Sequence, residues 1–134
     1  MDENQVKIAL ERYHTFKSHL RKCEGKLEEI AVKKYKMPGS IIKMPEGSPV
    51  SKESRLLDLL EKEEPLINDY RMNRYFIELA EFFISTLPKE EQGMVIDRYI
   101  NRKSCTWLEM NHSMSDKGQR KLIARRIKQF IEKT

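Results

Sequence analysis

Apolar residues near the start of the chain recur every three or four positions, a spacing that places them along one side of a helix. The series begins at Val6, continues to about Lys36, and includes Leu10, Tyr13, Phe16, Leu20, Cys23, Leu27 and Ile30. At 1.5 Å per residue such a helix is about 45 Å long, more than a small domain needs, so we expect it to have a packing partner. The pattern leaves three arrangements open: packing on its own domain, a coiled-coil hairpin with a later helix, or a dimer seam.

The whole chain has the composition of a helical protein. Charged residues make up 35% of the sequence and apolar residues 39%, with only five Gly and five Pro. Long strand-like runs of Val, Ile and Thr are missing. We therefore predict an all-α fold, with a long amphipathic helix at 1–37, a loop or linker at 38–54, a central helical region at 55–88 and a further helical module at 89–134.

Two features divide the middle of the chain. Residues 38–54 contain three of the five prolines and show no periodicity, which predicts a mobile loop. Four leucines between Leu56 and Leu60 then begin a helical region, which Pro65 either ends or restarts. From Ile67 to Thr86 the aromatic residues surround more than one side of the helix, so we expect this segment to be central to the fold.

The charge is unevenly distributed. The net charge is +5, and residues 89–134 carry eleven Lys or Arg against six Asp or Glu, a surplus equal to the net charge of the whole chain. The first residues are polar and acidic, and no apolar stretch approaches the roughly 20 residues that span a bilayer, so we expect a cytoplasmic protein with no membrane partner. With two cysteines, a disulfide framework is not expected.

The terminal module has the order of elements of a helix-turn-helix. Acidic residues open a helix at Lys89 that runs to Ile100, and a polar break follows at 101–104. Thr106 and Glu109 have the spacing of a capping box for a short helix, whose Trp107 and Met110 should face inward. A last helix is predicted from Ser115 or Asp116 to about Lys133.

The last helix separates apolar from basic residues. Ile123, Ile127 and Phe130 cluster on one side at 100° per residue, and Lys117, Lys121, Arg125 and Lys128 form a stripe almost opposite. A helix of this kind favours nucleic-acid binding, because one face packs while the other attracts phosphate. In a major groove, Gln119 could pair with adenine and Arg120 or Lys121 with guanine. Phosphate contacts are expected from Lys117, Arg125 and Lys128, together with Arg102 and Lys103 of the preceding loop.

Residues 85–131 carry a resemblance to a known family. The segments Asp97-Arg98-Tyr99-Ile100, Thr106-Trp107-Leu108-Glu109-Met110 and Ile123-Ala124-Arg125-Arg126-Ile127 resemble the sigma-factor region 4 helix-turn-helix of phage late-transcription regulators of the ArpU and RinA type. The resemblance implies an activator of phage or prophage late genes whose recognition helix is 116–131. The family usually has a Gly in the turn, whereas this chain reads Met110-Asn111-His112-Ser113-Met114-Ser115 and has its Gly at Gly118.

These patterns predict a sequence-specific transcription regulator that binds double-stranded DNA and is not an enzyme. The N-terminal helix would dimerise the chain or contact RNA polymerase. Two alternatives stay open: a small terminase subunit that binds DNA for packaging, and a helical adaptor that contacts polymerase or a sigma factor. His19 and Cys23 share a helix face, but further ligands of a tetrahedral site are not in evidence, so we expect no metal site, no cofactor and no catalytic residue.

Overall fold

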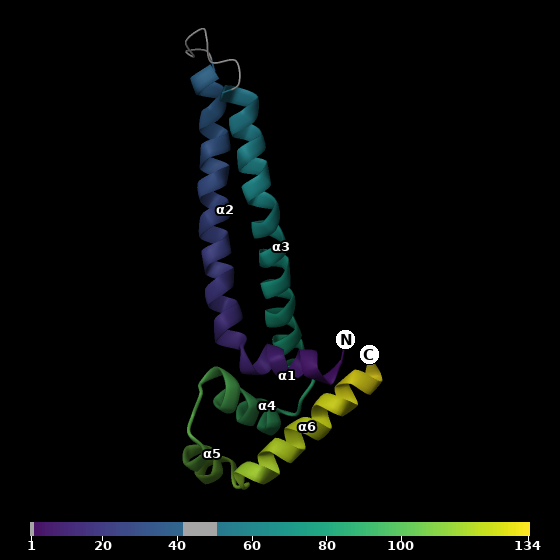
Figure 1. Ribbon diagram of the computed structural model, residues 1–134. Coiled ribbons are helices and arrows are strands. Elements are labelled where there is room, and N and C mark those ends of the chain that lie inside the picture. The colour runs from purple at the N-terminus through teal and green to yellow at the C-terminus, as the bar shows by residue number, and fades with distance from the viewer. Residues whose placement is uncertain (1, 42–50) are drawn as a thin grey trace. The chain divides into compact units, whose positions relative to one another are not determined.

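The computed structural model describes the backbone of residues 2–41 and 51–134, and the side chains of residues 2–35 and 54–134. The all-α prediction is confirmed, since every element in these ranges is helical and no described residue lies in a strand (Figure 1). The chain divides into two compact units. The first unit combines Met1–Lys17 with Arg74–Thr134, and the second unit is Ser18–Asn73.

The long N-terminal helix is interrupted, so the prediction of one continuous helix from Val6 to Lys36 is wrong. Helix α1 spans Glu3–Glu11 and begins with a capping box between Asp2 and Gln5. Helix α2 spans Tyr13–Ile41, and Arg12 separates the two with φ −107° and ψ 20°. Tyr13 and Phe16 at the start of α2 continue the buried stripe of α1, so the break does not follow from the apolar spacing.

The second unit is a pair of helices. It contains the part of α2 from Ser18 onward and the part of α3, which spans Ser51–Ser85, up to Asn73. The two segments run side by side (Figure 1), and an ion pair joins Lys34 to Glu63 with 2.6 Å between nitrogen and oxygen. Cys23 and Ile30 are buried. Of the three arrangements that the sequence left open, the structure has the hairpin.

The two ends of the loop predicted at 38–54 are helical in the structure. Helix α2 continues past Pro38 to Ile41, and α3 begins at Ser51, so both ends of the predicted loop are helical. Pro65 likewise lies inside α3. A proline removes one intrahelical hydrogen bond, which weakens a helix without always ending it. The predicted mobility falls on residues 42–50, which lie outside the described residues.

The first unit contains the remaining helices. After the end of α3 come α4 at Lys89–Val95, the π-helical segment η1 at Ile96–Ile100, α5 at Cys105–His112 and α6 at Asp116–Lys133. Helix α1 packs against α6 and η1. The fully buried apolar side chains of this unit come from almost every helix and include Val6, Leu10, Phe83, Val95, Leu108 and Ile127. The terminal helices thus share one core with α1 and the end of α3.

The aromatic residues at the end of α3 help to fix α1 and the start of α2. The Phe16 ring stacks on the Phe76 ring with centroids 4.7 Å apart. The Tyr13 hydroxyl donates a 2.7 Å hydrogen bond to Glu81 Oε1. Burial and this hydrogen bond raise the pKa of Tyr13 above its ordinary value. The prediction that this part of the chain is central to the fold agrees with these contacts.

The helix predicted from Lys89 to Ile100 changes geometry midway. Helix α4 ends at Val95, and the wider turn of η1 ends when the Asn101 amide donates to the Ile96 carbonyl at 2.8 Å. Such wide turns are rare and shift the register of the residues that follow. Here the turn directs Asp97 and Arg98 toward α5 and α6, as their hydrogen bonds show.

Candidate nucleic-acid interface

Helix α5 is capped two residues earlier than predicted. Ser104, not Thr106, is its cap, because the Ser104 hydroxyl accepts a 3.2 Å hydrogen bond from the Trp107 amide. Leu108 is the only buried residue of this short helix. Trp107 is half-buried and Met110 is 79% exposed, so the prediction that both face inward is wrong for Met110 and holds only in part for Trp107. An eight-residue helix buries one narrow side, and Leu108 occupies it.

The turn between α5 and α6 is tight. Ser113 adopts the left-handed conformation with φ 51° and ψ 32°, the backbone geometry that glycine tolerates best. The Ser115 hydroxyl then accepts from the Gly118 amide at 3.1 Å and caps α6. Glu109, predicted to cap its own helix, instead accepts a 2.8 Å hydrogen bond from the Asp116 amide. The chain therefore makes the turn with a serine at the left-handed position.

Gly118 has a different role from a turn glycine. A Cβ atom added there would lie 3.0 Å from Met114 Cγ and 3.1 Å from Ser115 Oγ. Those distances are tighter than ordinary van der Waals contact. The absence of a side chain at Gly118 therefore lets the turn lie against the first turn of α6.

Gln119 requires a correction. It was predicted to pair with a base, but its exposed fraction is 0%. Its side-chain nitrogen donates to the carbonyls of Leu108 and Met114, both at 3.0 Å, and its Oε1 accepts from Arg98 at 3.2 Å. A buried amide whose hydrogen bonds are satisfied within the protein has no atom left for a base. Gln119 instead ties the turn to both helices.

Arg98 and Asp116 form the charged part of the same network. Arg98 Nη2 donates to Asp116 Oδ1 at 2.6 Å, and the Arg98 side chain is 10% exposed. Arg120 approaches the other carboxylate oxygen at 3.0 Å, but its side chain is 66% exposed. The Arg98 hydrogen bond, with the smaller effect of the nearby positive charges, holds the pKa of Asp116 below its ordinary value. The first turn of α6 is therefore anchored to η1.

A second pair joins η1 to α5. His112 Nε2 lies 2.9 Å from Asp97 Oδ2, and Asn101 donates to Asp97 Oδ1 at 2.9 Å. Both side chains of the histidine pair are mostly buried. Sequence reasoning missed Asp97, Arg98 and His112 as structural residues of this module. No local pattern signals the bonds between Arg98 and Asp116 and between Asp97 and His112, because they span 18 and 15 residues.

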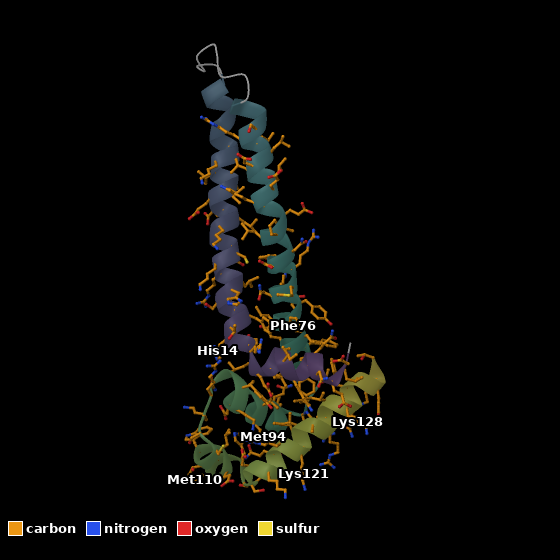
Figure 2. The ribbon with its side chains drawn as sticks, in the orientation of Figure 1. His14, Phe76, Met94, Met110, Lys121 and Lys128 are labelled. Carbon is orange, nitrogen blue, oxygen red and sulfur yellow. The ribbon has the colours of Figure 1, made fainter. Side chains whose placement is uncertain are left out.

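The outer side of α6 is basic and open. We call Lys117, Lys121, Arg125 and Lys128 the cationic face; all four are exposed, and none has an ion-pair partner among the described residues. Figure 2 shows Lys121 and Lys128 on the outer side of the helix. The opposite side is buried through Ile123, Ile127 and Phe130, as predicted. Ala124, which sequence reasoning missed as a site residue, is also exposed. Its side chain is shorter than those of the cationic face.

The loop before α5 adds two more exposed cations. Arg102 has a positive φ of 51°, and the Lys103 amide donates to the Asp97 carbonyl at 2.9 Å. The Lys103 ammonium lies 5.0 Å from the centroid of the Trp107 ring. The side chains of Arg102 and Lys103 are exposed, and among the described residues no hydrogen bond joins either of them to α6. The structure thus gathers four of the eight predicted site residues on one helix face, with Arg120 beside them.

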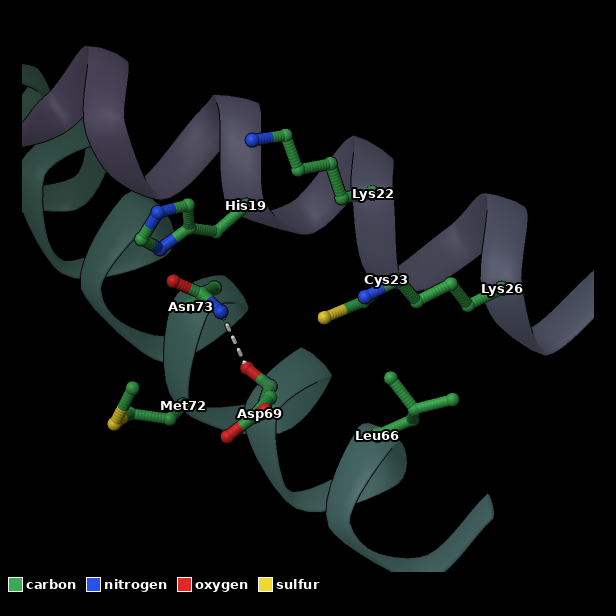
Figure 3. Close-up of a pocket in the computed structure, with 8 residues that line it drawn as sticks. All are labelled: His19, Lys22, Cys23, Lys26, Leu66, Asp69, Met72 and Asn73. Atoms are coloured by element: carbon green, nitrogen blue, oxygen red, sulfur yellow. Dashed lines mark hydrogen bonds between the residues drawn. The ribbon is translucent and has the colours of Figure 1, made fainter. Parts of the chain in front are cut away.

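The histidine and cysteine that share a helix face in the second unit lie at one cavity. Cys23 is buried and His19 is exposed, and together they line a cavity of about 240 Å³ between α2 and α3 (Figure 3). Asn73 lies in the same cavity and donates a 2.7 Å hydrogen bond to the Asp69 carbonyl. The described residues contain no cluster of three or more His, Cys, Asp or Glu side chains suited to a metal ion.

Comparisons with protein families, with curated proteins and with solved structures find no match to this chain. Within the described ranges, no helix has the length and apolar character to cross a bilayer.

Proposed function

We propose that this chain is a sequence-specific DNA-binding transcription regulator that inserts α6 into the major groove of duplex DNA. The observation that carries the proposal is the cationic face, which lies opposite a side buried in the core of the first unit. Lysine and arginine side chains without protein partners are free to neutralise phosphates, and that neutralisation supplies most of the affinity of DNA-binding proteins. The role is binding, not catalysis.

The contacts divide by position along α6. The first turns of a recognition helix meet the base edges, while later cations meet the backbone. Lys121 is the leading candidate for a guanine, and Arg120 can join it after releasing its exposed pair with Asp116. Ala124 can contact a thymine methyl group. Because Gln119 is buried, it is not assigned a base contact.

Phosphate contacts are assigned to the remaining cations. These are Lys117, Arg125 and Lys128 on α6, with Arg102 and Lys103 in the preceding loop. The resemblance to phage late-transcription regulators supports late or packaging genes of a phage or prophage as the targets, RNA polymerase as a further partner, and the cytoplasm as the place of action.

A titration with fluorescently labelled duplex DNA over a range of salt concentrations tests this proposal. Replacing Lys121 and Arg125 by alanine should lower the affinity and reduce the slope of log affinity against log salt by about 0.9, since Arg125 is the phosphate contact of the two and each such contact contributes roughly 0.9. A matched control replaces Lys22 and Lys26, two exposed cations of the second unit, and should leave both quantities unchanged. Unchanged affinity and slope in the α6 variant would contradict the proposal.

Selection of bound fragments from a random DNA pool separates the alternatives. A regulator should enrich one sequence, whereas an adaptor protein should enrich none and bind polymerase or a sigma factor instead. A small terminase subunit should assemble into a ring of many copies. A mass measurement on the same preparation distinguishes that ring from a monomer or dimer.

A further inference from the structure

The second unit leaves one of its sides apolar and uncovered. Leu56, Leu60 and Ile67 lie within about 40° of one another on α3 at 100° per residue, and Leu20, Leu27 and Tyr35 lie within about 80° on α2. Tyr35 is 86% exposed, and Leu56 and Leu60 are each 42% exposed. We call these six residues the open apolar face.

The other side of the same helix pair carries charged side chains at its cavity, together with the apolar Leu66 and Met72. Lys22, Lys26 and Asp69 line the cavity in Figure 3. On α3, Asp69 lies about half a turn from Leu60, and on α2, Lys26 lies about a third of a turn from Leu20. In an antiparallel pair both apolar stripes therefore fall on the side away from this cavity. The six residues of the open apolar face therefore share one side of the helix pair.

Two helices alone cannot enclose a core. Among the described residues of this unit, only Cys23, Ile30 and Asn73 are buried. Leu20, Leu27 and Ile67 remain half-buried. A helix pair of this kind gains most from a second layer that covers the half-buried residues.

We propose that the open apolar face binds the same face of a second copy of this chain, so that two hairpins form a four-helix bundle. An apolar face is complementary to itself, as a two-fold symmetric interface requires. The described side chains cover about 27 Å of α2 at 1.5 Å per residue, and a pair is roughly 20 Å wide. The interface then buries about 1,100 Å² in total, above the roughly 1,000 Å² that a specific interface needs.

Charge selects the orientation of the two copies. The described part of α2 in this unit, residues 18–35, carries five Lys or Arg against three Glu, whereas residues 54–73 of α3 carry three Lys or Arg against five Asp or Glu. A two-fold axis parallel to the helices places α2 of one copy over α3 of the other. That arrangement puts the basic helix on the acidic one.

The register brings one specific pair together. Cys23 shares a cavity with Asp69 and Asn73, so Glu24 lies nearly level with Arg71 in the hairpin. Both side chains are exposed, and neither has a partner among the described residues. Glu24 lies within the open apolar face on α2, and Arg71 lies beside it on α3. A parallel two-fold axis preserves height, so Glu24 of each copy meets Arg71 of the other. By the same rule Tyr35 meets Leu60.

Molar mass in solution, measured on the full chain by sedimentation equilibrium, tests this proposal. The unsubstituted chain should have twice its monomer mass at tens of micromolar. Leu60→Glu should give a monomer with unchanged helix content by circular dichroism, while Lys62→Glu, almost half a turn away on α3, should remain a dimer. A monomeric unsubstituted chain, or a dimer that survives Leu60→Glu, would overturn the proposal.

A charge exchange tests the orientation. Glu24→Arg and Arg71→Glu should each weaken dimerisation at least tenfold, because each homodimer then contains two like-charge pairs. Mixing the two variants should restore a dimer, since each contact between the copies is again between opposite charges. If mixing restores nothing, the assigned pairing is wrong. These readouts need no DNA, so they are independent of the proposed function.

Discussion

Arg98 in η1 and Asp116 at the start of α6 are joined at 2.6 Å, and the same guanidinium donates to the buried Gln119. One side chain therefore fixes both the first turn of α6 and the turn that precedes it. The cationic face has a defined direction because this inner network holds the helix from the opposite side.

Replacing Arg98 by methionine should destabilise the protein by about 2 kcal/mol, because the buried Gln119 loses its donor and Asp116 loses its nearly buried partner. Arg120→Ala is the matched control, since Arg120 contacts the same carboxylate from an exposed position. Its effect should stay within about 0.5 kcal/mol. Urea unfolding measures both, and equal losses would show that Arg98 has no special structural role.

Acid should weaken the link between η1 and α6. The folded pKa of Asp116 lies below its ordinary value of 3.8, so its ionised form stabilises the folded state above that pH. The contribution should disappear as the pH falls through the lowered folded pKa. Urea unfolding of the unsubstituted chain and of Asp116→Asn at a series of pH values should show a difference at neutral pH that shrinks below 3.8. A difference that does not depend on pH would refute the assignment.

Ser113 occupies a left-handed position that costs a side-chain-bearing residue about 1 kcal/mol. Ser113→Gly should therefore raise the free energy of unfolding by a similar amount. Ser113→Ala keeps the Cβ atom and should bring no such gain. Thermal unfolding of the two variants makes the comparison, and equal melting temperatures would argue against strain at this turn.

Gln119→Leu should lower stability by about 1–3 kcal/mol, because it removes three hydrogen bonds and leaves two carbonyls without their donor. The sequence enriched from a random DNA pool should not change, since the side chain is buried. Lys121→Ala should give the reverse result, with little loss of stability and a changed base preference. A new base preference in Gln119→Leu would show instead that this residue takes part in base recognition.

The helices and their buried sides could be predicted from sequence because they follow local spacing. The stripe on α6 is an example, since Ile123 and Ile127 are four residues apart and both are buried. The same rule contained the correct answer for Gln119, which precedes Ile123 by four residues and so shares its buried side. The side-chain amide of Gln119 suggested a base contact, but its position on α6 places it on the buried side.

Other features could not be read from local patterns. The break at Arg12 carries no local signal, because the apolar spacing continues across it through Tyr13 and Phe16. The contacts of Arg98 and His112 join residues 15 or more positions apart, and no local spacing encodes them. Met110 was placed inward because it is apolar, but Leu108 already fills the narrow buried side of α5.

The central claim is that the cationic face of α6 contacts duplex DNA, and amide chemical shifts of the nitrogen-15-labelled chain test it most directly. On titration with a selected duplex, the largest shifts should fall at residues 117–128 and at Arg102 and Lys103. Residues 18–35 of the second unit should change little. Shifts confined to the second unit, or none at low salt with equimolar duplex, would contradict the claim.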